Sequence, residues 1–507
     1  MTQRYRRRRL ALFSALALAL PLAVTGPALA DPSNNSPAKL TKAVTLDGVL
    51  RHLDALQAIS DTHGDRAAGR PGFQVSVNYV VGQLNAAGYS PTVQAFDFPY
   101  VEDNSRLDRI APVARIFARD TDFNRNGFTP TFEGDVTGVI EPVDVIVPPA
   151  PAPNTSTSGC EAADFAGFTP GKIAMLQRGT CGFNVKVLNA QAAGASAVIL
   201  FNEGQPGRTG LVTPIGDTPG LAIPVVFATY AAAEELIVLT PGATVRVKVD
   251  FTEETRTAWN VFAESQYGNA NNVVMAGAHL DSVQDGPGIN DNGSGSAALL
   301  ETAIQMSKVK TNAKVRFAWW GAEEEGLLGS EHYVANLSPA EQDKIALYLN
   351  FDMVGSPNHF FGVYDGDDSS GTAPVPIPPG SAQIEDVFEK FYADRGLPFE
   401  DTEFSGRSDY GPFIAVNIPA GGLFTGAEGI KTAQQAALYG GTAGVAFDPC
   451  YHQPCDTRAN LNLTALDVNA DAIATAVITF AFDTSTVNGV RAPGKSHGRA
   501  PQRGELS

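Results

Sequence analysis

Hydrophobic and polar positions follow three different patterns along this chain. Near the N-terminus, apolar residues recur at helical spacing over residues 46–59 and again over 73–87. Residues 130–255 contain short apolar strands and one helical stretch. After residue 256, apolar strands alternate with helices, and strands are expected at 273–280, 315–320 and 345–351. Strands that are apolar throughout indicate a sheet covered on both faces, with functional groups at the carboxyl ends of its strands.

These patterns predict two folded parts. A discontinuous α/β domain is expected from residues 31–130 and 256–485, with a mainly-β module inserted at 131–255. The inserted module contains no histidine, so we interpret it as non-catalytic. Residues 486–507 lack apolar periodicity, and we expect them to form a flexible C-terminal tail.

The first 30 residues have the composition of a signal peptide. Five arginines precede a short apolar run over residues 10–24, and Ala28-Leu29-Ala30 fits a cleavage site with small residues. We therefore expect a secreted, extracellular protein, exported by the general or the twin-arginine route. No later run reaches the roughly 18 apolar residues of a spanning helix, so no membrane partner is expected. A net charge of −18 disfavours nucleic acid as a partner, and we expect a monomer.

Four cysteines in an exported chain indicate two disulfides. The simplest of the three possible connectivities joins Cys160 to Cys181 and Cys450 to Cys455. A zinc site built on the second pair is the alternative, because His452 lies between those two cysteines.

Histidine and carboxylate side chains gather at the predicted strand ends. The candidates are His279, Asp281, Asp291, Glu323, Glu324 and Asp352, with His452 far downstream. Zinc accepts imidazole nitrogen and carboxylate oxygen, and a pair of zinc ions can activate a water for hydrolysis while a nearby carboxylate takes its proton. Each residue alone has an ordinary interpretation, such as a turn-forming Asp or a solvated Glu at a helix start. Together they favour a metal hydrolase.

Several long motifs carry a family resemblance. They are His279-Leu280-Asp281-Ser282-Val283, the turn 286–297, Trp319-Trp320-Gly321-Ala322-Glu323-Glu324, Asn350-Phe351-Asp352-Met353-Val354-Gly355, Gly406-Arg407-Ser408-Asp409, Cys450-Tyr451-His452 and Arg66-Ala67-Ala68-Gly69-Arg70-Pro71-Gly72. They resemble the double-zinc aminopeptidases of the secreted bacterial leucyl type. Gly179-Thr180-Cys181-Gly182-Phe183 resembles part of a protease-associated domain. The resemblance implies an α/β zinc exopeptidase fold, with a mixed, mostly parallel central sheet between helices and an inserted mainly-β protease-associated domain.

The resemblance also implies a site with two zinc ions. His279 and Asp352 would hold one ion, Glu324 and His452 the other, and Asp291 would bridge both. A complete set of ligands argues against a relative that has lost catalysis.

The remaining roles follow from the same motifs. Asp281 would fix the imidazole of His279, Glu323 would be the general base, and Tyr451 would hydrogen-bond the oxyanion. The positions expected to line the substrate cleft are Met353, Arg407 and Phe424. The family also suggests a calcium site at Asp467 and Asp471, although Lys42 stands where a further acid is expected.

The implied activity is removal of N-terminal residues from peptides, with a preference for large apolar residues. A closed pocket with several carboxylates favours a free α-amino group, which is a cation. The alternatives are a carboxypeptidase or a single-zinc glutaminyl cyclase on the same scaffold, and a peptide-binding scaffold without catalysis. A basic cluster would favour the carboxypeptidase, and near the motifs only Arg407 is evident.

Overall fold

The computed structural model describes residues 33–490, which fold into two compact units. One unit consists of Met1–Asp97 and Thr257–Ser507, of which residues 1–32 and 491–507 lie outside the described chain, and the other of Phe98–Arg256. The expected signal peptide, and the expected tail beyond residue 490, lie outside the described residues. The first residues of that expected tail belong to a short helix, α13 (Ser485–Asn488).

The second unit begins earlier than the sequence predicts. We expected the inserted module at 131–255, whereas the structure assigns residues from Phe98 onward to it. The reason lies in strand pairing, because β2 (Arg106–Ala111) pairs along its length with β11 (Thr244–Val249) at the far end of the module. Residues 148–153, which are rich in proline, form a loop inside this unit.

The first unit is built on one mixed sheet with the strand order β1-β12-β14-β13-β15-β18-β16-β17. Its four central strands run parallel, which confirms the predicted fold class: β14 (Ala313–Trp320), β13 (Asn269–His279), β15 (Ile345–Phe351) and β18 (Ala420–Phe424). The outer strands are β1 (Thr92–Asp103), β12 (Phe251–Glu264), β16 (Gly362–Tyr364) and β17 (Glu400–Thr402), of which β12 and β16 run antiparallel to their inner neighbours.

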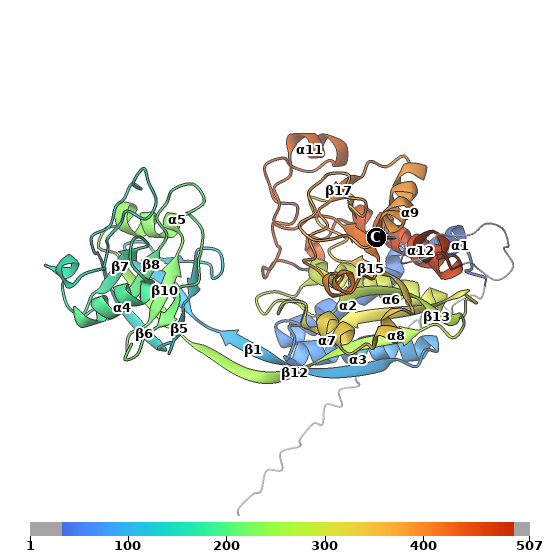
Figure 1. Ribbon diagram of the computed structural model, residues 1–507, viewed down its shortest axis with the longest axis horizontal. Helices are drawn as coiled ribbons and strands as arrows, with labels where there is room; N and C mark the ends of the chain where they lie inside the picture. Colours follow the sequence, from blue (N-terminus) through green and yellow to red (C-terminus); the bar gives the residue numbers. More distant parts are fainter. Residues whose placement is uncertain (1–32, 491–507) are drawn as a thin grey trace, which may run out of the picture. The chain divides into compact units, whose positions relative to one another are not determined.

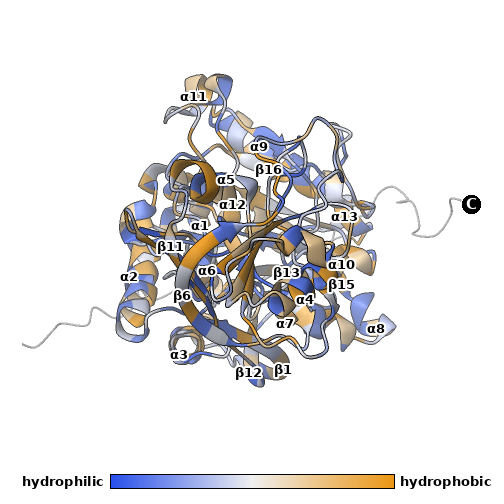
Figure 2. Cartoon of the chain, turned by 90° about the vertical axis from the view of Figure 1, so that its left-hand side faces the viewer, coloured by the Kyte–Doolittle hydropathy of each residue, from blue (hydrophilic) through white to orange (hydrophobic). Residues whose placement is uncertain are grey.

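Helices cover both faces of this sheet, and two adjacent tryptophans of β14 show why. Trp319 donates from its indole to the Ser296 carbonyl of α6 (Gly295–Met306) at 3.2 Å, while Trp320 packs on the opposite face with Tyr333 and Phe413. The other helices of this unit are α1 (Pro37–Ala43), α2 (Leu46–His63), α3 (Pro71–Ala87), α7 (Leu328–Ala335), α8 (Pro339–Gln342), α9 (Ser381–Asp394), α10 (Gly411–Ala415), α11 (Ala433–Tyr439) and α12 (Leu463–Phe482). In Figure 2, α2 carries both hydrophilic and hydrophobic residues, as expected of a helix with one buried side.

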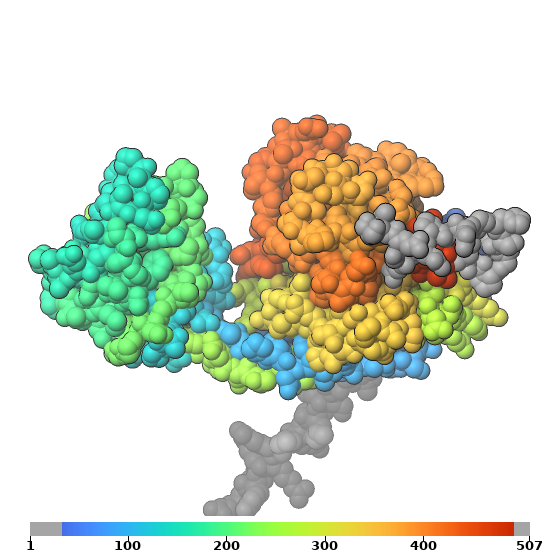
Figure 3. All heavy atoms as spheres, in the orientation of Figure 1, coloured from blue at the N-terminus to red at the C-terminus, as the bar shows by residue number. Residues whose placement is uncertain are grey.

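Helix α12 is long and apolar enough to cross a membrane, which corrects the expectation that no segment after the signal peptide reaches that length. It is instead a core helix, since 67% of its most apolar window is buried within the fold, where it lies beside α1 (Figure 1). In contrast to the buried helix α12, residues 428–446 after β18 are mostly exposed and lie on the surface of the unit (orange to red in Figure 3).

The second unit is mainly β, as predicted. Its sheet has the order β3-β2-β11-β6-β7-β8-β10-β4, and alternate residues of β7 point into two apolar cores, Ile173 and Met175 into one, Ala174 and Leu176 into the other. Its further elements are β3 (Arg115–Ile116), β4 (Phe123–Arg125), β5 (Gly127–Thr129), β6 (Gly134–Pro142), β7 (Ile173–Gln177), α4 (Phe183–Ala192), β8 (Ala197–Phe201), β9 (Ile215–Asp217), β10 (Val225–Ala228) and α5 (Tyr230–Glu234).

The cysteines form the two expected disulfides. Cys160 is bonded to Cys181 in the second unit, and Cys450 to Cys455 in the first. Both sulfur atoms that flank His452 are therefore used in a covalent bond, which removes the alternative of a cysteine-based zinc site there.

Candidate metal centre

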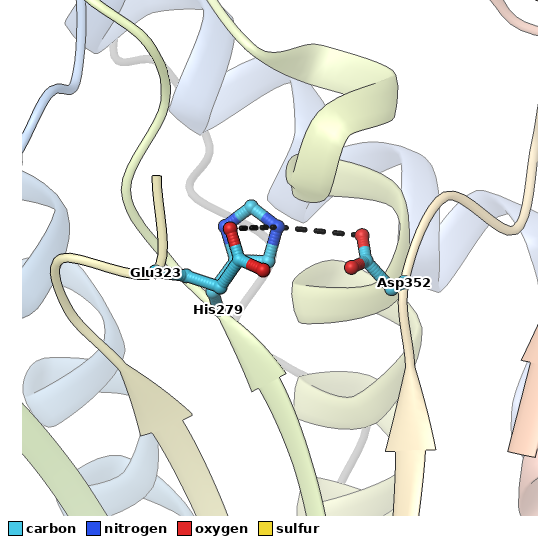
Figure 4. A group of neighbouring side chains, drawn as sticks. All are labelled: His279, Glu323 and Asp352. Carbon is cyan, nitrogen blue, oxygen red and sulfur yellow. Dashed lines mark ion pairs between the residues drawn. The ribbon is translucent and has the colours of Figure 1, made fainter. Parts of the chain in front are cut away.

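Three of the candidate residues follow neighbouring parallel strands of the first unit. His279 ends β13, Glu323 comes shortly after β14, and Asp352 follows β15 directly. The carboxyl ends of these strands meet at one edge of the sheet, and Figure 4 shows the side chains pointing toward one another there. Parallel pairing of the strands therefore gathers residues that are far apart in the sequence.

The imidazole of His279 is buried among three carboxylates. Its Nε2 atom lies 3.1 Å from Asp291 Oδ1, 3.3 Å from Asp352 Oδ1 and 3.9 Å from Glu323 Oε2. The side chain of His279 is only 1% exposed. A nitrogen enclosed by carboxylate oxygens at these distances is typical of a position that a cation can occupy.

A second group of the same kind shares Asp291. His452 Nε2 lies 3.2 Å from Asp291 Oδ2 and 3.0 Å from Glu324 Oε2. The two oxygens of Asp291 thus face two different histidines, each of which has a further carboxylate beside it. This arrangement offers two cation positions with one carboxylate between them.

Among the buried atoms without a hydrogen-bond partner in residues 33–490 are two carboxylate oxygens of this cluster. They are Glu324 Oε1 and Asp352 Oδ1. A buried carboxylate oxygen without a partner is costly, because it has lost its hydration. Histidine nitrogen and carboxylate oxygen are the donors that zinc accepts in proteins, so these residues fit zinc.

The ionisation of these groups reflects burial and mutual charge. Burial raises the pKa of Glu323 well above its ordinary value, and burial together with the charge of Asp291 raises the pKa of Glu324 to about 7. Burial acts against the charge of His452, yet its hydrogen bonds to Asp291 and Glu324 raise its pKa to about 10. Burial likewise opposes the charge on Asp291, whose pKa is nevertheless lowered because both histidines hydrogen-bond it. The cluster holds more carboxylates than the two histidines neutralise, which favours a bound cation.

Asp281 is buried beside His279, the imidazole that it is expected to fix, and contacts it through its backbone. His279 Nδ1 lies 3.2 Å from the backbone carbonyl of Asp281 and 3.7 Å from its carboxylate. The carboxylate instead accepts the backbone N–H groups of Glu323 and Glu324, each at 3.3 Å. Asp281 therefore connects the end of β13 to the turn that presents both glutamates.

Asp352 is oriented by a serine for which the sequence predicts no role. Ser408 donates to Asp352 Oδ2 at 2.6 Å and accepts from Asn350 Nδ2 at 2.9 Å. This contact fixes one carboxylate oxygen and leaves the other directed at His279. The Gly406-Arg407-Ser408-Asp409 motif was the available signal in the sequence.

A cavity of about 160 Å³ opens beside the cluster, and every residue expected to line the substrate cleft lies on its wall. Those residues are Met353, Arg407 and Phe424, and the wall also includes Tyr451, Asp291, Glu323, Glu324 and Asp352. Met353 and His452 adopt left-handed backbone conformations with φ of 50° and 56°. Non-glycine residues avoid this conformation, so the surrounding fold holds both residues in place at a cost in conformational free energy.

The two residues expected to bind calcium do not join a comparable group. Asp467 and Asp471 lie on α12, and Asp471 Oδ2 accepts from Arg395 at 2.7 Å. Within residues 33–490, neither residue belongs to a group of three or more ligand atoms close enough for one ion. A guanidinium thus neutralises Asp471.

Comparisons with known proteins identify the families to which this chain is similar. The model of peptidase family M28 matches residues 260–477, and that of the PA domain matches residues 144–236. An aminopeptidase of Pseudomonas aeruginosa is 48% identical over 459 residues, covering 90% of this chain and 84% of that protein. Leucine aminopeptidase 2 of Trichophyton rubrum is 38% identical over 474 residues, covering 92% and 91%. The structure of BSAP, a zinc aminopeptidase from Bacillus subtilis, superposes with a TM-score of 0.55 at 24% identity, over 85% of this chain and 94% of that one.

Proposed function

Because the chain belongs to peptidase family M28, with a PA domain in the same chain, we propose that it is a two-zinc aminopeptidase that hydrolyses the N-terminal peptide bond of peptides. One observation supports the proposal that two ions bind. The oxygens of Asp291 face His279 at 3.1 Å and His452 at 3.2 Å, so one carboxylate serves two positions. His279 and Asp352 would hold one ion, and Glu324 and His452 the other.

The side chains around the ions would carry out the proton transfers. When bound, a pair of zinc ions supplies a polarised carbonyl and a water of lowered pKa. Glu323 lines the cavity beside the cluster and would take the proton of the attacking water and pass it to the leaving amine. Tyr451 also lines the cavity, and its hydroxyl would donate to the oxyanion that develops.

The charges of the cavity support an enzyme that recognises a free amino group. Among the residues that line it, Arg407 is the one cation, and it lies 3.8 Å from Glu428 on the exposed rim. A carboxypeptidase needs a free cation to bind the C-terminal carboxylate, whereas a wall that includes the further carboxylate of Glu403 suits the ammonium group of an N-terminus.

The apolar part of the wall supports a preference for large apolar N-terminal residues. Met353, Tyr364 and Phe424 line the same cavity as the carboxylates. Burying an apolar side chain against such a wall contributes roughly 1.5–3 kcal/mol. The relative from Trichophyton rubrum carries the name leucine aminopeptidase, which points to the same preference.

We further propose that the protein acts outside the cell as a monomer. Two disulfides persist only in an oxidising compartment, and both occur here. In this proposal Phe98–Arg256 is a non-catalytic module, since the residues of the cluster all belong to the other unit.

The deciding experiment compares leucine p-nitroanilide with its N-acetylated form, with and without a chelator. We expect cleavage of the free amine alone, its loss on chelation and its recovery with zinc. Equal cleavage of both substrates would contradict the exopeptidase assignment, and cleavage that resists chelation would contradict the metal assignment.

A further inference from the structure

The turn that leads to Asp291 is held from two opposite sides by buried charges. Arg66, from the loop between α2 and α3, contacts the carbonyl groups of the turn. Asp456, from the segment after the Cys450–Cys455 disulfide, contacts its N–H groups. Neither residue lies in the histidine and carboxylate groups that could hold an ion.

Arg66 donates to three carbonyl oxygens from one guanidinium group. Its Nε donates to Pro287 at 3.0 Å, and its two terminal nitrogens donate to Leu280 and Gly288. Arg66 is 0% exposed, and although burial lowers its pKa to about 10, it stays charged at neutral pH. The rigid planar fork of arginine suits three fixed acceptors in a way that a lysine cannot reproduce.

Gly288 makes this approach possible. Its φ is 61°, and a Cβ atom there would lie 2.4 Å from the Asp291 carbonyl and 3.1 Å from an Arg66 terminal nitrogen. A side chain at this position would push the guanidinium away from the turn.

Asp456 holds three consecutive N–H groups on the other side of the same turn. Its carboxylate accepts from Asn290 at 2.8 Å and from Asp291 at 3.0 Å, while its backbone carbonyl accepts from Ile289 at 3.1 Å. Asp448, just before the disulfide, accepts from the Asn290 side chain at 2.6 Å. The segment that presents His452 is therefore tied directly to the segment that presents Asp291.

We propose that Arg66 and Asp456 are positioning residues that clamp the turn 287–291 and thereby set the place of Asp291 between the two ions. The proposal rests on the proposed function, because it assumes that Asp291 bridges two zinc ions. In the clamp, the carbonyl groups of Pro287 and Gly288 face the guanidinium, and the N–H groups of Asn290 and Asp291 face the carboxylate, so the turn is held from both sides before any ion binds. Outer groups of this kind typically alter metal affinity by about 10- to 100-fold.

Two conservative variants test the clamp from its two sides. Asp456→Asn keeps the shape but places an NH₂ group against an N–H donor, and Arg66→Lys keeps the charge but loses the fork. Glu301→Gln is the matched control, because Glu301 is also a buried carboxylate of this unit, but it bonds His52 and Gln305. Zinc affinity of the metal-free proteins is measured by competition with a chelator. The absorption spectrum of the Co²⁺-loaded proteins reports the geometry of the ions.

We expect both clamp variants to lose about 10- to 100-fold in affinity for zinc and to change the Co²⁺ spectrum, while Glu301→Gln changes neither. The double variant should lose less than the product of the two single losses, because both residues act on one turn. Unchanged affinity and spectra in folded clamp variants would overturn the proposal. A wild-type protein that binds fewer than two zinc ions would overturn the proposed function instead.

Discussion

Replacing Glu323 by glutamine distinguishes between the two roles that its position allows, metal ligand and general base. Glu323, His279 and Asp352 together place three ligand atoms close enough for one ion, so Glu323 could be a ligand. Its Oε2, however, lies 3.9 Å from His279 Nε2, farther than the oxygens of Asp291 at 3.1 Å and Asp352 at 3.3 Å. The geometry therefore favours a general base that stands beside the ions.

The expected loss can be estimated from this role. Glutamine has the shape of glutamate, and the backbone N–H of residue 323 would still donate to Asp281. Only the proton acceptor is removed, and a general base contributes typically about 10²- to 10⁴-fold to the rate. That factor corresponds to about 2.7–5.5 kcal/mol in the activation barrier. We expect the fall in kcat, with KM for leucine p-nitroanilide little changed.

The assay pairs steady-state kinetics with zinc content by elemental analysis. Glu323→Gln should keep two zinc ions per chain. The control is Glu325→Gln, because Glu325 belongs to the same glutamate run but to none of the groups that could hold an ion. Loss of one zinc would make Glu323 a ligand, and a loss of activity below tenfold would mean that another group is the base.

Three further outcomes are expected. Asp291→Ala should lose both zinc and activity, and two tightly held ions would refute the bridge. The pKa of His452 is raised to about 10, so zinc must displace a proton from this side chain at pH 7. The affinity for zinc, measured by competition with a chelator, should therefore rise up to about tenfold per pH unit toward pH 10. An affinity that does not change with pH would contradict this. The Thr257 hydroxyl donates to Asp97 at 2.8 Å, so the two ends of the first unit are close enough for a short linker to replace Phe98–Arg256. The shortened protein should keep its zinc and its activity on p-nitroanilides. A folded variant without zinc would show that the module completes the site.

The central sheet and the cluster of histidines and carboxylates were predictable because the ends of the apolar strands mark both. The central strands are apolar over their whole length, and the charged residues begin where the apolar runs end, as His279 and Asp352 do. Parallel strands bring such ends to one edge, so spacing alone indicated a metal site. The roles of single residues came from the resemblance, since spacing does not distinguish Glu323 from Glu324.

What the sequence did not reveal depends on contacts between distant segments. Arg395 neutralises Asp471 from 76 positions away, and no local pattern indicates that pair. The first boundary of the inserted module is set by the pairing of β2 with β11, which are separated by most of the module. The contact of Arg66 with the turn before Asp291 is also long-range, and its one signal was an arginine in a glycine-rich motif.

The spread of the proposed ligands along the chain has a consequence for stability. They come from positions between 279 and 452, on segments that meet only when β13, β14 and β15 are paired. No shorter part of the chain could bind zinc in this way, so the ions would bind the folded unit and not its fragments. An ion at 100 times its dissociation constant adds about 2.7 kcal/mol to the stability of the state that binds it. Zinc would thus stabilise the whole unit, and its removal should lower the stability even of α12, which supplies none of the proposed ligands.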